Sequence, residues 1–71
     1  MDTQKTAQEL IAKHLEHCKD DNHLTAIYYA HQEALKEAME NMRSTTEIPQ
    51  IIFWMNVGEV IASDLNKQSK N

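Results

Sequence analysis

The stretch "HLTAIYYAHQEALKEAMENMR", from His23 to Arg43, decides the fold of this chain. Its apolar side chains recur in alternating steps of four and three residues, a spacing that keeps them on one face of an α-helix. They are Leu24, Tyr28, His31, Leu35, Ala38 and Met42, with Ile27, Ala34 and Met39 widening the same face. Charged and amide side chains fill the opposite face. The stretch therefore predicts an amphipathic helix over about residues 23–43.

Two more helices are predicted, one on each side of this stretch. The first covers about residues 3–19, where apolar residues again recur at three- and four-residue spacing. The third covers about residues 47–65, with Pro49 in its first turn, where the missing N–H costs no hydrogen bond. The expected N-cap residues are Thr3 or Thr6 for the first helix, one of Asp20, Asp21 and Asn22 for the second, and Thr46 for the third.

The composition bounds the fold class. With one glycine and one proline in 71 residues, the chain has little material for the tight turns of a β-sheet. We expect an all-α protein, either a small three-helix bundle or a helical hairpin plus a third helix. It would form one domain over residues 1–66, with a disordered tail over residues 67–71. A chain of this length buries only about 60% of its unfolded surface on folding, so we expect dimerisation to complete the bundle.

The segment "IPQIIFWMNVGEVIASDL", Ile48 to Leu65, is more apolar than a helix of such a bundle requires. Arranged as a helix, it is apolar around most of its circumference, apart from a narrow polar strip. A domain of this size cannot surround such a helix, which indicates that a second chain covers part of it. Phe53 and Trp54 are the expected anchors, because aromatic side chains carry a large share of interface energy. The predicted interface residues are Ile51, Phe53, Trp54, Met55, Val57, Gly58, Val60, Ile61 and Leu65.

Gly58 leaves more than one interpretation of this segment open. In one, Gly58 and Ala62 form a smooth notch in a continuous helix, where another helix can approach closely. In another, Gly58 breaks the segment into a helix, a turn and a second helix, an arrangement similar to a helix-turn-helix unit. A third interpretation is a β-strand, since β-branched and aromatic residues favour strands, although this strand would have to pair with another molecule.

The charge pattern argues against nucleic acid and membrane as direct partners. Seven basic and eleven acidic residues give a net charge of −4, whereas binding to phosphates depends on clustered lysine and arginine. The apolar segment is also too polar to span a bilayer, since Asn56, Glu59 and Asp64 interrupt it. Cys18 is the only cysteine, and no secretory leader precedes the first helix, so we expect a cytoplasmic protein.

Three histidines and the cysteine raise the question of a metal site. His14 and His17, and likewise His14 and Cys18, are one helical turn apart, and His31 could add a further ligand. The chain lacks the paired spacing of cysteines and histidines that zinc motifs have. We therefore expect no metal and no other cofactor.

His31 lies in the middle of an apolar stripe, which predicts a hydrogen-bonded core or interface residue. Tyr28 or Tyr29 is its expected partner. Burial would hold the pKa of His31 below the ordinary value of about 6.5, because a buried imidazole loses the hydration of its charged form. The sequence therefore predicts that association of the protein is sensitive to mild acid.

Motifs of enzymes are missing from the sequence. It has no Gly-rich phosphate loop, no serine-centred elbow and no HExxH pattern. Three short helices also offer no cleft of the size that a small-molecule substrate needs. We therefore expect no enzymatic activity and no catalytic residues.

The stretch "DNHLTAIYYAHQEALKE", Asp21 to Glu37, resembles the central helix of the Hha/YmoA family. The shared residues are Asp21, Asn22, Leu24, Tyr28, Ala30, Leu35 and Glu37, and an Ile48–Pro49 pair and Trp54 follow at similar spacing. Members of that family are small all-helical proteins that bind the nucleoid protein H-NS and modulate transcription. The resemblance implies a transcription-associated regulator. The basic opening helix of that family has no counterpart here, so no binding residue is carried over.

Together these features predict a small cytoplasmic protein-interaction module, of the kind found as regulatory or accessory proteins in bacteria and phages. It would act by helix-mediated binding to itself, as a homodimer, or to another protein partner. The alternative is a transcription-associated regulator of the Hha/YmoA type, or a helix-turn-helix protein that binds DNA weakly.

Overall fold

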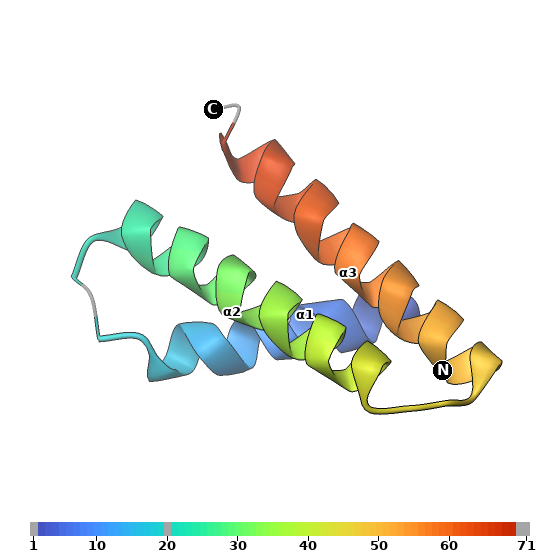
Figure 1. Cartoon of the computed structure of the whole chain (residues 1–71). Coiled ribbons are helices and arrows are strands. Elements are labelled where there is room, and N and C mark those ends of the chain that lie inside the picture. Colours follow the sequence, from blue (N-terminus) through green and yellow to red (C-terminus); the bar gives the residue numbers. More distant parts are fainter. Residues whose placement is uncertain (1, 20, 70–71) are drawn as a thin grey trace.

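The computed structural model describes residues 2–19 and 21–69, which form three helices (Figure 1). These are α1 (Thr3–His17), α2 (His23–Arg43) and α3 (Ile48–Ser69). The described residues contain no β-strand, so the predicted all-α fold of three helices is confirmed. The alternative of a strand in the third segment is wrong.

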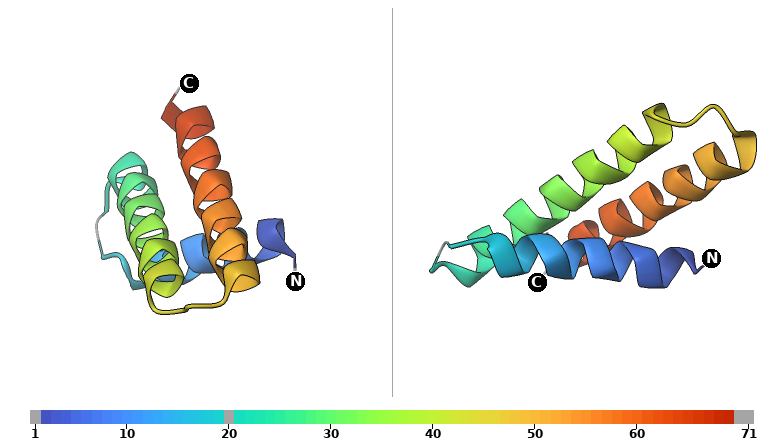
Figure 2. Two further views of the ribbon diagram at one scale, coloured as in Figure 1. Left: turned by 45° about the vertical axis from the view of Figure 1, so that its right-hand side comes forward. Right: turned by 90° about the horizontal axis from the view of Figure 1, so that it is seen from below.

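The helices α2 and α3 lie side by side and run in opposite directions, and α1 crosses both on one side (Figures 1 and 2). Residues 44–47 link α2 to α3, and residues 18–22 link α1 to α2. The two long helices diverge toward the start of α2 and the end of α3 (Figure 1). Each helix packs on both of the others.

The start of each helix follows from local capping chemistry. The Asn22 side chain accepts a hydrogen bond from the Thr25 N–H at 3.1 Å, which confirms one of the three predicted caps of α2. For α1 the cap is Asp2, not Thr3 or Thr6, since its carboxylate accepts from the Lys5 N–H at 3.2 Å. A carboxylate at this position also interacts favourably with the positive end of the helix dipole.

The ends of α1 and α3 differ from the predicted bounds. Helix α1 ends at His17, two residues early, because Cys18 takes an extended conformation. Helix α3 begins at Ile48, and the Ile51 N–H donates to the carbonyl of Glu47, so Thr46 is not its cap. The disordered tail predicted for residues 67–71 is wrong for residues 67–69, which continue α3, whereas residues 70–71 lie outside the described part. Lysine and glutamine are good helix formers, and Lys67 suits the negative end of the helix dipole.

The core is built on a row of small side chains along α2. Alanines recur there every four residues and are all buried; they are Ala26, Ala30, Ala34 and Ala38. Ala34 and Ala38 pack with a cluster from the other two helices. Its members are Ala7 and Leu10 of α1 and Val57 and Ile61 of α3. Because an alanine side chain is short, α1 and α3 can both approach the backbone of α2 closely. The row therefore fixes which face of α2 points inward.

This alanine row corrects the predicted core face of α2. Leu24 and Tyr28 belong to the predicted apolar face, yet both are mostly exposed. Ala26 and Ala30, outside the predicted face, are buried instead. The reason is close packing, since the helices come together along the small residues and leave the larger apolar stripe beside them.

Gly58 lies within the continuous helix α3, so the interpretation of this segment as helix, turn and helix is wrong. A methyl group added at Gly58 would lie 3.4 Å from Cδ1 of Leu35. The space beside Gly58 is thus bounded by a side chain of α2 from the same chain. Gly58 permits the contact between α2 and α3 without breaking α3.

We expect the variant Gly58→Ala to raise the free energy of unfolding by up to about 1 kcal/mol, because alanine favours the helix interior over glycine. The added methyl group meets only the flexible end of Leu35, at a distance of ordinary contact. Urea unfolding of a dilute sample measures the change. The control, Ala62→Gly on the same helix, should lower stability by about 1 kcal/mol. A loss at Gly58→Ala as large as that of the control would show that the helices need the glycine.

Candidate functional site

An apolar stripe runs along the outer face of α3. It consists of Ile48, Ile52, Met55 and Ala62, interrupted by Glu59, and its steps alternate between four and three residues. All five of these residues are exposed. The same spacing forms the seam of a coiled coil, in which side chains of one helix insert between those of another. In α3 this seam faces away from the core residues Val57 and Ile61.

A second apolar stripe lies on α2, beside the alanine row. Its members are Leu24, Tyr28, Leu35, Met39 and Met42, which share one face of the helix. Leu24, Tyr28 and Met39 are exposed, and the other two are partly covered by α3. The stripe therefore borders α3 without being buried under it.

The two stripes meet in a groove of about 280 Å³ between α2 and α3, which we call the α2–α3 groove. Its lining residues are Leu35, Met39, Met42, Trp54, Met55, Gly58, Glu59 and Ala62. Three of the four methionines of the chain are among them. Methionine side chains are flexible and polarizable, so a surface rich in them adapts to an apolar partner.

Charged residues border the groove on both sides. On α2, Lys36 and Arg43 line a shallow depression next to Leu35 and Met39. On α3, Glu59 stands within the lining of the groove itself. The α2 border thus carries Lys36 and Arg43 together with Glu40, and the α3 border carries Glu59.

The structure places the nine predicted interface residues in three groups, and Trp54 belongs to two of them. Val57 and Ile61 have no exposed surface and belong to the core, so no partner can reach them. Phe53, Trp54 and Val60 pack against this core and are partly buried, as are Ile51 and Leu65. Trp54, Met55 and Gly58 line the α2–α3 groove.

The predicted anchors Phe53 and Trp54 pack against each other as well as on the core. Their ring centroids are 5.1 Å apart with an angle of 74° between the planes, an edge-to-face arrangement. Trp54 reaches the groove, whereas Phe53 is not among the residues that line it. The largest exposed apolar side chains of α3 are instead Ile48, Ile52 and Met55.

The sequence reasoning missed the contribution of α2 to this surface, together with Ile48 and Ile52. A signal was present, because α2 carries two apolar stripes, the alanine row and the larger stripe of Leu24, Tyr28 and Met39. One helix in a three-helix chain cannot bury both. Hydrophobicity alone favours burial of the larger side chains, which is the opposite of the observed packing.

His31 joins α2 to the C-terminal half of α3, and its side chain is only 3% exposed. Its Nε2 lies 2.6 Å from Oδ2 of Asp64, and its Nδ1 lies 2.7 Å from the carbonyl oxygen of Ile27, one turn earlier in α2. The expected partners Tyr28 and Tyr29 are not used. The predicted location of His31 in the core is confirmed, and its hydrogen bonds come from the backbone and from α3.

The donors and acceptors around His31 define where its protons lie. A carbonyl oxygen only accepts, so Nδ1 carries a proton and donates it to Ile27. Nε2 lies against Oδ2 of Asp64, so both ring nitrogens of His31 have a polar partner. The Asp64 side chain is 45% exposed, so the pair is open to water on the aspartate side only.

We expect Asp64→Ala to lower the free energy of unfolding by about 1–3 kcal/mol, since it leaves the buried Nε2 of His31 without a partner. In a His31→Leu background the same change should cost less than about 0.5 kcal/mol, because no buried polar group is left unpaired. Chemical denaturation of the four proteins of this cycle measures both values. Equal losses in the two backgrounds would contradict a stabilising role of the pair.

A second polar cluster joins α1 to α2 on the far side of the bundle. The carboxylate of Glu37 accepts from Nζ of Lys13 at 2.7 Å and lies 2.9 Å from Nε2 of His14. The hydrogen bond from Lys13 holds the pKa of Glu37 below its ordinary value, and His14 acts in the same direction, whereas partial burial opposes them. The side chains of Lys13 and Glu37 are 48% and 29% exposed, so water weakens their attraction.

Because folding lowers the pKa of Glu37, its pairing stabilises the protein above pH 4.5, the ordinary pKa of this carboxyl. That contribution, less than about 1 kcal/mol for a pair this exposed, disappears as the pH falls through the lower folded pKa. We expect Glu37→Gln to lose it at neutral pH and to show a flatter decline of stability in acid. Thermal unfolding across this pH range checks the effect. Glu40→Gln on the same helix, as the control, should keep the acid decline of the wild type.

The three histidines considered as metal ligands have other partners. His14 faces Glu37, and Nδ1 of His17 lies 2.8 Å from the carbonyl oxygen of Lys13 in its own helix. Cys18 is a free, half-buried cysteine, and His31 is directed toward Asp64. Within residues 2–19 and 21–69, no three side chains of the histidine, cysteine or acidic type come close enough to hold a metal ion.

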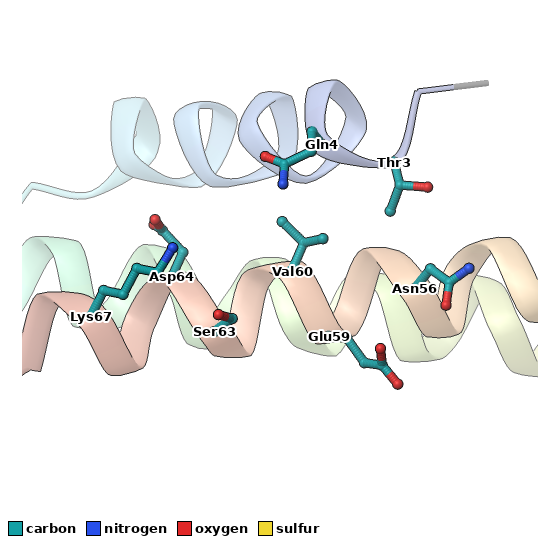
Figure 3. Close-up of a pocket in the computed structure, with 8 residues that line it drawn as sticks. All are labelled: Thr3, Gln4, Asn56, Glu59, Val60, Ser63, Asp64 and Lys67. Atoms are coloured by element: carbon teal, nitrogen blue, oxygen red, sulfur yellow. The ribbon is translucent and has the colours of Figure 1, made fainter.

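A polar groove of about 470 Å³ lies between the start of α1 and the second half of α3 (Figure 3). Asp64 points toward α1 across this groove, while Glu59 points away from it (Figure 3). The one acidic side chain directed into the groove is thus already bound to His31. This leaves the α2–α3 groove as the surface whose chemistry has no partner within the described chain.

None of the three helices in the described part is long and apolar enough to cross a membrane. Comparison of the chain with protein-family models, with curated proteins and with solved structures gave no match. The resemblance of residues 21–37 to the Hha/YmoA family therefore depends on the residues quoted for it alone.

Proposed function

We propose that this protein is a protein-interaction module and that the α2–α3 groove is its binding surface. The observation that carries the proposal is the seam-like stripe on the outer face of α3, Ile48, Ile52 and Met55, which are each more than half exposed. Large apolar side chains at this spacing are more stable packed against a helix of a partner than exposed to water. The groove beside them is lined by methionine and tryptophan side chains, which the same partner would contact.

The surface suits a protein partner better than the other ligand classes. The lining of the groove is apolar apart from Glu59, so it offers few polar groups to orient a small polar substrate. The outer face of α3 likewise carries Glu59 and no cation between Ile48 and Asn66, which is unfavourable for DNA phosphates. Helix-in-groove binding uses apolar contacts at three- and four-residue spacing, as found here.

In this proposal the chain acts in the cytoplasm as a small regulatory or accessory protein of bacterial or phage type. A free cysteine such as Cys18 persists in a reducing compartment. In this proposal, regulation proceeds by occupying a surface of the partner.

Site-specific photo-crosslinking in the producing cells tests the binding surface. A photoreactive phenylalanine analogue at Met55 should give a covalent adduct of one defined mass, because Met55 is exposed in the groove. The same analogue at Gln8, exposed on α1 away from the groove, is the matched control and should give none. Peptide mass spectrometry identifies the crosslinked chain. If Met55 gives no adduct, or Gln8 gives the same one, the groove is not the binding surface.

A further inference from the structure

We infer that the occupant of the α2–α3 groove is a second copy of this chain, placed so that α2 of each copy lies on α3 of the other. This inference rests on the proposed function and names the partner of the same surface. Three features of the surface support it: its area, the match of its apolar stripes, and the charges at its borders.

The exposed apolar area is that of one side of a stable interface. Six large side chains face outward from the two stripes with exposed fractions between 40% and 74%, namely Leu24, Tyr28, Met39, Ile48, Ile52 and Met55. At about 200 Å² for a fully exposed side chain of this size, they present on the order of 700 Å². A standard interface buries about 800 Å² on each partner, and the largest apolar patch on a typical monomer is about 300–600 Å².

The surface is complementary to itself. Its two walls are apolar stripes, one on α2 and one on α3, and both follow coiled-coil spacing. In a two-fold dimer, the same patch on both copies must match itself. With the axis along the groove, the α2 stripe of one copy lies on the α3 stripe of the other, so that Met39 and Met42 of one copy meet Ile52 and Met55 of the other.

The register between the helices determines which residues would meet. The contact between Leu35 and Gly58 puts these two residues at the same level of the bundle. Since α2 and α3 run in opposite directions, Met39 stands level with Trp54 and Met55, and Met42 stands level with Ile51. A two-fold axis along the groove therefore brings Met39 of one copy onto Met55 of the other.

The border charges select this axis over the other two-fold arrangement. Lys36 is the residue after Leu35 on α2, and Glu59 is the residue after Gly58 on α3. They lie on opposite borders of the groove, near the same level of the bundle. An axis along the groove pairs each Lys36 with Glu59 of the other copy, which gives two attractive pairs. An axis across the groove would put Lys36 next to Lys36 and Glu59 next to Glu59. Glu40 also lines the depression beside Lys36, and together with Glu37 it borders a further depression toward His14 of α1.

Charge reversal tests both the partner and its orientation. The wild type should be a dimer by sedimentation equilibrium at micromolar concentration. We expect Lys36→Glu and Glu59→Lys each to weaken dimerisation about tenfold, since two border attractions become repulsions in each case. The double variant carrying both changes, and an equimolar mixture of the two single variants, should restore dimerisation. Lys5→Glu, an exposed site on α1 with the same change of charge, is the control and should leave it unchanged.

The outcomes separate this inference from the proposed function. A monomer at high micromolar concentration, together with a Met55 adduct to a different protein, overturns the second copy and leaves the binding surface in place. A dimer whose affinity the single reversals do not change overturns the orientation. A monomer with no Met55 adduct rejects the surface itself. Circular dichroism confirms that each variant keeps its helices, so that a loss of dimer is not a loss of fold.

Discussion

Close packing along the alanine row of α2 is the constraint on which the rest of this structure depends. Ala30, Ala34 and Ala38 have no exposed surface, and Ala34 and Ala38 pack with buried residues of both α1 and α3. Methyl-sized side chains at this spacing let three helix backbones approach one another, which a row of leucines would prevent. Once this row points inward, the orientation of every other residue on α2 follows from the helical repeat.

The first consequence is the outward position of the larger apolar stripe. In a chain of 71 residues the core is small, and its two largest fully buried side chains are Ile61 and Val57. Packing the small residues inside leaves Leu24, Tyr28 and Met39 exposed, at a cost of about 25 cal/mol for each Å² of apolar surface. A monomer gains no stability from that arrangement, whereas a binding surface needs it. The geometry of the core and the proposed function thus have the same origin.

The second consequence concerns how the two long helices are held where they diverge. Toward the start of α2 the apolar core ends, and His31 with Asp64 provides the polar contact between α2 and α3 at this level. The pair consists of one buried and one half-exposed residue, so water reaches it from the Asp64 side. On the opposite side, Glu37 binds α1 to α2 through Lys13 and His14. Apolar packing sets the position of the helices, and these polar contacts set their register.

The sequence by itself determined the helices, because spacing, capping residues and the scarcity of glycine are local properties. It specified the bounds of α2, a cap among Asp20, Asp21 and Asn22, a core or interface position for His31, and the excess of apolar residues in the third segment. Only the tertiary structure decided which of the two apolar stripes of α2 is buried, that Val57 and Ile61 belong to the core, and that Asp64 is the partner of His31. Those choices depend on how closely three backbones can approach, and on contacts between residues more than thirty positions apart, which no local pattern encodes.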